Sequence, residues 1–276
     1  MKSAITVSLV PEARGGPFVY WDDLEAAFAS ASRLGFDALE IFPATPEAAA
    51  PAIVRPLMEK YGLAVAALGT GGGWVAHKWH FGSPDPAIRA QARAFVRGIV
   101  EAAAALGAKA IVGSMQGKPE PGVSRDQAIA WLAEALEDLG AVAEDLGQPL
   151  LYEPLNRYES HLFNRLGQTV EFLGTLRTKN VKVLADMFHM NIEEVSVPLA
   201  IRATGRAIGH FHFADSNRHA IGFGHTDVAL ITDALQESGY DGYVSGEVLP
   251  LPDSESAAAQ TLRAYRRYVL GMTNDE

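Results

Sequence analysis

The sequence contains no cysteine among its 276 residues. Disulfide bonds, thiolate catalysis and sulfur-ligated metals are therefore excluded. It also lacks any apolar run of the ~18 residues that a membrane helix needs. The apolar run at residues 5–10 has neither the length nor the flanks of a signal peptide. We therefore expect a cytoplasmic protein that does not bind a membrane.

Positive charge is also scarce and scattered. Lys and Arg number 23 against 33 Asp and Glu, which gives a net charge of −10, and the basic residues form no stripe. Proteins that bind nucleic acid usually present a basic surface to the phosphates, so nucleic acid is disfavoured as a partner. Hydrophobic residues make up 48% and charged residues 20%, a balance typical of a globular chain with a large core.

Short apolar runs alternate along the whole chain with longer segments of helical period. We expect strands at residues 4–10, 38–42, 63–68, 110–112, 149–153, 181–186, 207–213 and 242–248. Helices are expected at residues 21–34, 47–61, 86–106, 124–146, 167–177, 192–203, 227–238 and 254–270. Glycines at 35, 62, 107 and 147 stand where helices commonly end, and Ser124 is a good N-cap.

Eight strand–helix units in strict alternation predict a parallel sheet that closes into a single (β/α)8 TIM barrel spanning residues 1–276. An open doubly wound sheet is the alternative. It is disfavoured because residues 11–16 follow the first strand where such a sheet often has a G-x-G-x-x-G turn. No linker or shift in composition divides the chain, so we expect one domain.

Four consecutive strands of this barrel each end in a residue that can bind a metal. Glu153, Asp186, His212 and Glu247 stand at or just after the ends of the fifth to eighth expected strands. In such barrels the carboxyl ends of the strands meet at one rim, where active sites lie. Considered one at a time, these residues have simpler explanations. A carboxylate at a strand end is often only the N-cap of the next helix, and a lone histidine such as His212 is more often a hydrogen-bonded core residue than a metal ligand. His210 shares the strand parity of His212, so we expect it one layer lower as a structural or metal-supporting histidine.

Taken together, the four residues favour a metal site. Three carboxylates buried at one rim would repel one another unless a cation or protons compensated them. A shell of three carboxylates and one imidazole suits one divalent ion, Mn²⁺ first, with Mg²⁺, Co²⁺ or Zn²⁺ as alternatives. The sequence therefore predicts a single divalent cation held by these side chains.

Several segments of the second half also resemble the ketose 3-epimerases, the tagatose and psicose epimerase group within the xylose-isomerase-like sugar isomerases and epimerases. The similar segments are Tyr-Glu-Pro-Leu-Asn-Arg-Tyr-Glu at 152–159 with His161 and Asn164, Asp-Met-Phe-His-Met-Asn-Ile-Glu-Glu at 186–194, His-Phe-His at 210–212, Asp-Ser-Asn-Arg at 215–218 and Gly-Phe-Gly-His at 222–225. They cover about residues 150–247, whereas the first half matches in architecture alone.

The resemblance implies roles for seven residues. The metal ligands would be Glu153, Asp186, His212 and Glu247; Glu153 and Glu247 would also form the acid–base pair, and Glu159, His189 and Arg218 would bind substrate. The chain departs from the group after Arg218, after Glu247 and at residues 113–117. These departures leave the metal site intact, but they leave open whether the enzyme is an epimerase or an aldose–ketose isomerase.

The expected function is thus a metal-dependent sugar isomerase or epimerase of carbohydrate metabolism, which abstracts a proton from a small keto sugar and proceeds through a stabilised enediolate. A metal-dependent lyase or dehydratase of the inosose or keto-acid type remains an alternative, and a non-catalytic sugar-binding barrel is a weaker one. An apurinic-site endonuclease would need more histidines at the rim. No basic phosphate site is evident, which favours a free sugar. A homodimer or a homotetramer is our expectation for assembly, which the sequence does not fix.

A cluster of aromatic residues follows the third expected strand. Trp74, His77, Trp79 and His80 could form an apolar wall against a sugar, or a packing or subunit contact. The sequence does not separate these two interpretations. The glycines at 71–73 could allow the backbone to approach a ligand closely.

Overall fold

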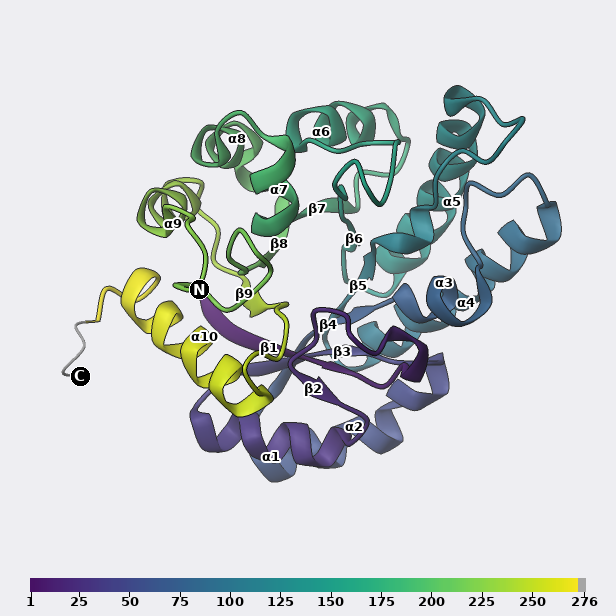
Figure 1. Cartoon of the computed structure of the whole chain (residues 1–276). Helices are drawn as coiled ribbons and strands as arrows, with labels where there is room; N and C mark the ends of the chain where they lie inside the picture. The colour runs from purple at the N-terminus through teal and green to yellow at the C-terminus, as the bar shows by residue number, and fades with distance from the viewer. Residues whose placement is uncertain (273–276) are drawn as a thin grey trace.

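The computed structural model describes residues 1–272, which form a closed parallel barrel surrounded by helices (Figure 1). The nine strands are β1 (Lys2–Ser8), β2 (Tyr20–Trp21), β3 (Ala38–Phe42), β4 (Ala64–Gly69), β5 (Lys109–Val112), β6 (Leu150–Tyr152), β7 (Val181–Asp186), β8 (Ile208–His212) and β9 (Tyr243–Gly246). Pairing of β1 with both β3 and β9 closes the barrel, and β2 adds two residues beside the end of β1. The (β/α)8 fold predicted from the alternation is confirmed.

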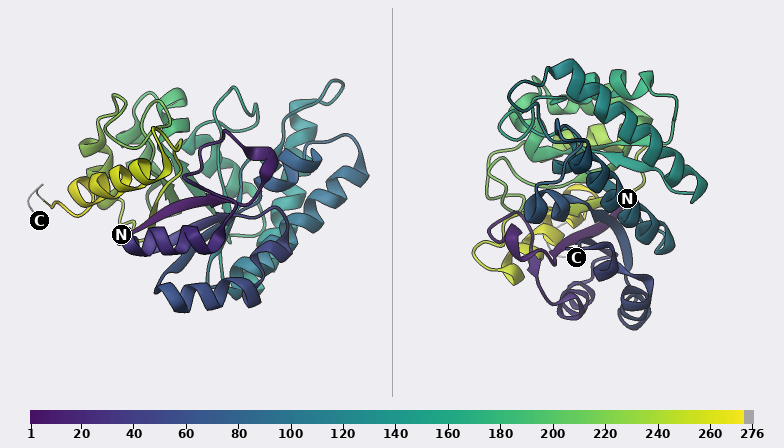
Figure 2. Two further views of the ribbon diagram at one scale, coloured as in Figure 1. Left: turned by 60° about the horizontal axis from the view of Figure 1, so that its bottom comes forward. Right: turned by 90° about the vertical axis from the view of Figure 1, so that its right-hand side faces the viewer.

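The helices lie outside the strands on every side, as the two turned views also show (Figure 2). They are α1 (Leu24–Leu34), α2 (Pro51–Tyr61), α3 (Gly71–His77), α4 (Pro86–Ala105), α5 (Arg125–Asp145), α6 (Leu166–Thr175), α7 (Met187–Glu193), α8 (Val197–Thr204), α9 (Val228–Glu237) and α10 (Ser254–Tyr268). Ser124 caps α5 through its side chain, as expected, and Gly35 and Gly62 end α1 and α2 in the left-handed conformation. No helix within residues 1–272 is long and apolar enough to cross a membrane.

Buried apolar side chains of residues 1–272 form three clusters. One large cluster fills the space between the barrel and the helix ring, and it includes Phe28, Leu132 and Phe211. Two small clusters are separate from it, one built on Ile111 and Leu184 and the other on alanines of β1, β3 and β4. Because Ile111 lines the cavity at the barrel mouth, the cluster built on Ile111 and Leu184 lies inside the barrel, beneath the site.

Three elements differ from the sequence-based expectation. The glycine run after β4 begins a helix, α3, and no helix was expected there. The helix expected at 192–203 is two helices, α7 and α8, because Pro198 stands in the first turn of α8, where its missing N–H costs no helical bond. The two-residue strand β2 had no clear pattern in the sequence.

Candidate metal centre and active site

Glu153, Asp186, His212 and Glu247 converge at the barrel mouth. One ligand atom from each lies within 4.8 Å of every other, and all four side chains are buried. Glu153 and Glu247 directly follow β6 and β9, whereas Asp186 and His212 are the last residues of β7 and β8. The parallel strands thus deliver the four groups to one point, as the sequence predicts; their roles as ligands stay a prediction.

Asp186 combines a structural contact with its place in the cluster. Its Oδ1 accepts hydrogen bonds from the backbone N–H of Phe188 at 2.7 Å and of His189 at 3.4 Å, which caps α7. Its Oδ2 faces the other way, 3.2 Å from His212 Nδ1. The helix-cap interpretation and the metal-site interpretation of this carboxylate are therefore compatible.

Electrostatics within the cluster depend on His212 and Glu153. The Nδ1 atom of His212 lies 3.5 Å from Glu153 Oε1 and 3.3 Å from Glu247 Oε2. Burial opposes protonation of His212, but the carboxylates of Glu40 and Glu247 raise its pKa well above the ordinary value. Burial raises the pKa of Glu153 to about 8. Its Oε1 has no hydrogen-bond partner among the described residues.

That orphaned oxygen is one reason to test the cluster against a divalent cation. A buried polar atom without a partner normally binds something, and here it faces an imidazole nitrogen and two further carboxylates. Charge, donor type and spacing all fit one cation of the Mn²⁺ or Mg²⁺ kind. The residues present are thus able to hold a metal ion.

Arg218 brings positive charge to the same carboxylates. Its Nη1 donates to Asp186 Oδ2 at 2.7 Å and its Nη2 pairs with Glu247, while the guanidinium lies 4.8 Å from the ring centroid of Phe188. Burial works against the charged form, yet Asp186 and Glu247 raise the pKa of Arg218 further above its ordinary value. The side chain of Arg218 points into the cavity rather than into solvent. Its backbone φ is 63°, which is unusual for a residue other than glycine.

His189 and Glu159 are linked to each other through Asn156. The Asn156 amide donates to His189 Nδ1 at 2.8 Å and to Glu159 Oε1 at 2.8 Å. Because Nδ1 accepts, the proton of a neutral His189 sits on Nε2, which lies 3.7 Å from Glu153 Oε1. Burial lowers the pKa of His189 to about 4, so the ring is neutral near neutral pH and can donate a hydrogen bond to a substrate oxygen.

A cavity of about 360 Å³ is lined by five of the site residues, Glu153, Glu159, His189, Arg218 and Glu247. Phe18, Phe42 and Trp74 supply an apolar wall, and Glu159 and Arg218 are among its polar groups. A pocket with a largely apolar wall and a few convergent polar groups is typical of a small-molecule site.

Only one member of the aromatic cluster after β4 lines this cavity. Trp74 does so, whereas Trp79 stacks on His77 with ring centroids 4.2 Å apart and packs against Phe95. His80 is buried, and its Nε2 atom lies 2.9 Å from Glu120 Oε1. The wall interpretation therefore fits Trp74, and the packing interpretation fits the other three.

Two residues that support the site were not predicted from the sequence. Gln116 donates from its amide to the backbone carbonyl of Glu153 at 2.9 Å and accepts from Tyr152 Oη at 2.6 Å, so it fixes the end of β6. Glu40 accepts from both histidines of β8. A carboxylate inside the apolar strand 38–42 was a visible signal for Glu40, whereas Gln116 had none.

A glycine also lies beside the Glu153 carboxylate. A Cβ atom on Gly113 would lie 2.6 Å from Glu153 Oε2, so that a side chain at this position would force the carboxylate to shift. The absence of a side chain at the end of β5 therefore leaves room for the carboxylate that β6 directs into the cavity.

Comparison with known proteins agrees with this geometry. The family described as Xylose isomerase-like TIM barrel matches residues 28–268. A D-psicose 3-epimerase of Ruminiclostridium cellulolyticum is 32% identical, covering 82% of this chain and 80% of that protein. An L-ribulose 3-epimerase of Methylomonas sp. is 30% identical, covering 87% and 83%. The crystal structure of a D-allulose 3-epimerase from Methylomonas sp. superposes with a TM-score of 0.82 at 26% identity, covering 97% of this chain and 99% of that one.

Proposed function

This chain belongs to the xylose isomerase-like TIM-barrel family, and we propose that it is a divalent-metal-dependent epimerase. Its substrate would be a small, free keto sugar, in which it would invert the configuration of the carbon beside the carbonyl. Its relatives support an isomerase-class enzyme. The observation that carries the proposal is the convergence of three carboxylates and one imidazole on one point beside the cavity. One of these carboxylate oxygens has no hydrogen-bond partner among the described residues.

A divalent cation bound by Glu153, Asp186, His212 and Glu247 would supply a Lewis acid that stabilises negative charge on the substrate oxygen as the proton leaves. The protein would supply the rest. Arg218 and the Nε2–H of His189 both face the cavity, so they would hold the carbonyl and hydroxyl oxygens in place. Glu159 would accept a hydrogen bond from a hydroxyl near the mouth.

Proton transfer would use the two glutamates. Glu153 and Glu247 follow β6 and β9, which are separated by two strands, so their carboxylates enter the cavity from different sides. One carboxylate would take the proton from the carbon next to the carbonyl, and the electrons of the broken C–H bond would form the double bond of an enediolate. The other, in its protonated form, would return a proton to the opposite face. The net reaction consumes no co-reactant and inverts one stereocentre.

A panel of free ketoses and aldoses tests this proposal, with Mn²⁺ added and NMR in D₂O as the readout. We expect interconversion of two ketoses that differ at C3, with one solvent deuteron at that carbon. Conversion of ketose to aldose would make the protein an aldose–ketose isomerase. A product lighter by one water would make it a lyase. Undiminished turnover after complete chelation would refute the metal-dependent reaction.

A further inference from the structure

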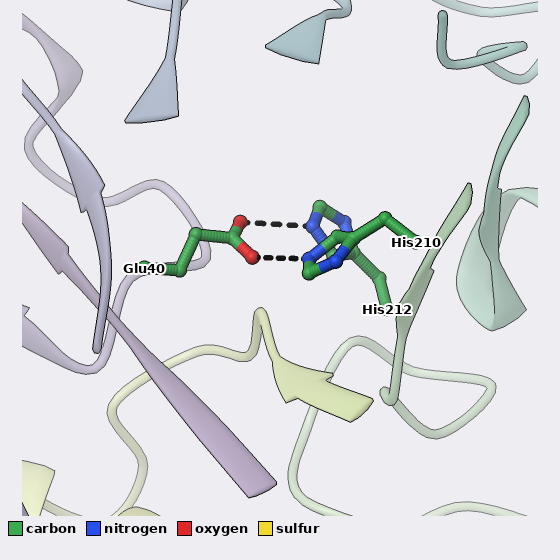
Figure 3. Close-up of side chains that lie close together, drawn as sticks. All are labelled: Glu40, His210 and His212. Atoms are coloured by element: carbon green, nitrogen blue, oxygen red, sulfur yellow. Dashed lines mark hydrogen bonds and ion pairs between the residues drawn. The ribbon is translucent and has the colours of Figure 1, made fainter. Parts of the chain in front are cut away.

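A second polar layer lies directly beneath the candidate metal centre. Glu40, in the middle of β3, is fully buried, and each of its carboxylate oxygens faces one histidine of β8 (Figure 3). Oε2 lies 2.6 Å from His210 Nε2 and Oε1 lies 2.9 Å from His212 Nε2. A buried carboxylate is costly unless it is paired and hydrogen-bonded, and here both oxygens are satisfied.

This contact determines how His212 can present itself to a cation. A carboxylate only accepts hydrogen bonds, so the proton of a neutral His212 must sit on Nε2, toward Glu40. Its Nδ1 is then an unprotonated lone pair, directed at Asp186 Oδ2, Glu153 Oε1 and Glu247 Oε2. Metal-bound histidines commonly donate their other N–H to a carboxylate, which fixes the ring and makes the free nitrogen a better donor.

We propose that Glu40 is the positioning residue of the metal centre: it holds His212 in the Nε2–H form and strengthens Nδ1 as a ligand by its negative charge. This inference rests on the metal part of the proposed function. It assigns a role to a residue of the first half of the chain that does not touch the cavity.

Glu40, His210 and His212 could instead be a second metal site, since their ligand atoms also lie within 4.8 Å of one another. The geometry argues against it. The O–N distances of 2.6 and 2.9 Å are those of hydrogen bonds. A cation there would also require Nε2 of His212 to lose its proton while Nδ1 binds the first ion. Glu40 and His210 do not line the cavity, whereas Glu153 and Glu247 of the first cluster do.

Glu40→Gln removes the charge while keeping the shape. The amide oxygen can still accept from His212, and the amide nitrogen can donate to His210 if that ring shifts its proton to Nδ1, which has no partner among the described residues. The variant is thus expected to fold. His210→Gln is the matched control, because it changes an equally buried neighbour in the same network and keeps an N–H donor near Glu40.

The test is Mn²⁺ binding to wild-type protein and both variants by calorimetry, with the melting temperature of the metal-free forms measured alongside. We expect one ion per chain, a loss of about 10–100-fold in affinity for Glu40→Gln, and little change for His210→Gln. Equal affinity in wild type and a folded Glu40→Gln variant would overturn the role of Glu40 alone. A wild-type protein that binds no Mn²⁺ would overturn the metal part of the proposed function itself. Two ions per chain, one of them lost in Glu40→Gln, would establish the second site instead.

The wild-type protein offers an independent measurement should Glu40→Gln fail to fold. Histidine-labelled protein loaded with Mg²⁺ reports the protonated ring nitrogen of His212 through its long-range ¹H–¹⁵N couplings, with His212→Asn to assign the signals. We expect Nε2–H. A proton on Nδ1 would overturn the proposal, because that nitrogen would then be unable to bind the ion.

Discussion

Replacing Arg218 by Ala separates the substrate-binding role of this residue from the metal site that it contacts. The change removes the guanidinium that pairs with Asp186 at 2.7 Å and with Glu247, and leaves both buried carboxylates without that cation. Breaking a buried ion pair costs about 3–5 kcal/mol. For a domain of this size each kcal/mol corresponds to roughly 2–4 °C, so the metal-free variant should melt about 6–20 °C below wild type.

A bound cation should reverse most of this loss, because it compensates the same carboxylates. We therefore expect Mn²⁺ to raise the melting temperature of Arg218→Ala more than that of wild type, with metal content intact and turnover strongly reduced. Arg218→Lys is the control: it keeps the charge, but it lacks the planar fork that reaches two carboxylates at once. It should recover much of the stability and little of the turnover.

Melting temperatures measured with EDTA and with excess Mn²⁺, together with metal content by mass spectrometry, decide the matter. A metal-free Arg218→Ala protein that melts within about 2 °C of wild type would show that the two ion pairs contribute little. Loss of metal from the variant would show that Arg218 supports the metal centre rather than the substrate. Turnover of Arg218→Ala at the wild-type rate would show that Arg218 takes no part in the reaction.

Three further outcomes are expected. Glu153→Gln and Glu247→Gln should each abolish net epimerisation, and one of the two variants should still exchange the substrate proton for solvent deuterium. If both variants convert substrate as fast as wild type, the acid–base assignment is wrong. Exhaustive chelation should abolish turnover and lower the melting temperature, and Mn²⁺ should restore both; a chelated protein with unchanged melting would contradict a cation at this cluster. Asp215→Asn tests how the free energy of unfolding depends on pH. Burial opposes ionisation of Asp215, but hydrogen bonds from backbone N–H groups of its own loop hold the pKa of its carboxyl below the ordinary value. The resulting stability is present above the unfolded-state pKa of about 3.9 and is lost as the pH falls through the folded-state pKa. The difference in stability between wild type and Asp215→Asn should therefore close below about pH 4, and a difference that persists in acid would contradict this origin.

The barrel and the place of its four candidate ligands can be predicted from the order of residues alone. Alternation of strand and helix predicts parallel strands, and parallel strands bring their carboxyl ends to one rim. Because Glu153, Asp186, His212 and Glu247 all stand at such ends, their proximity followed without knowledge of any side-chain contact. The direction in which the Arg218 side chain points could not be predicted in this way. It lies in a loop with positive φ, where neither period nor propensity indicates which way a side chain points.

The contact of Glu40 with the two histidines of β8 depends on the tertiary structure and could not be predicted from the sequence. Glu40 lies 170 residues before His210, and no periodicity relates the two positions. They meet because the closed barrel directs side chains of β3 and β8 toward the same axis, at the same height. The interior of a parallel barrel is a single shared space, so a buried carboxylate there must find its partners across the axis. Those partners are set by strand stagger and closure, which are properties of the whole sheet and of no single segment.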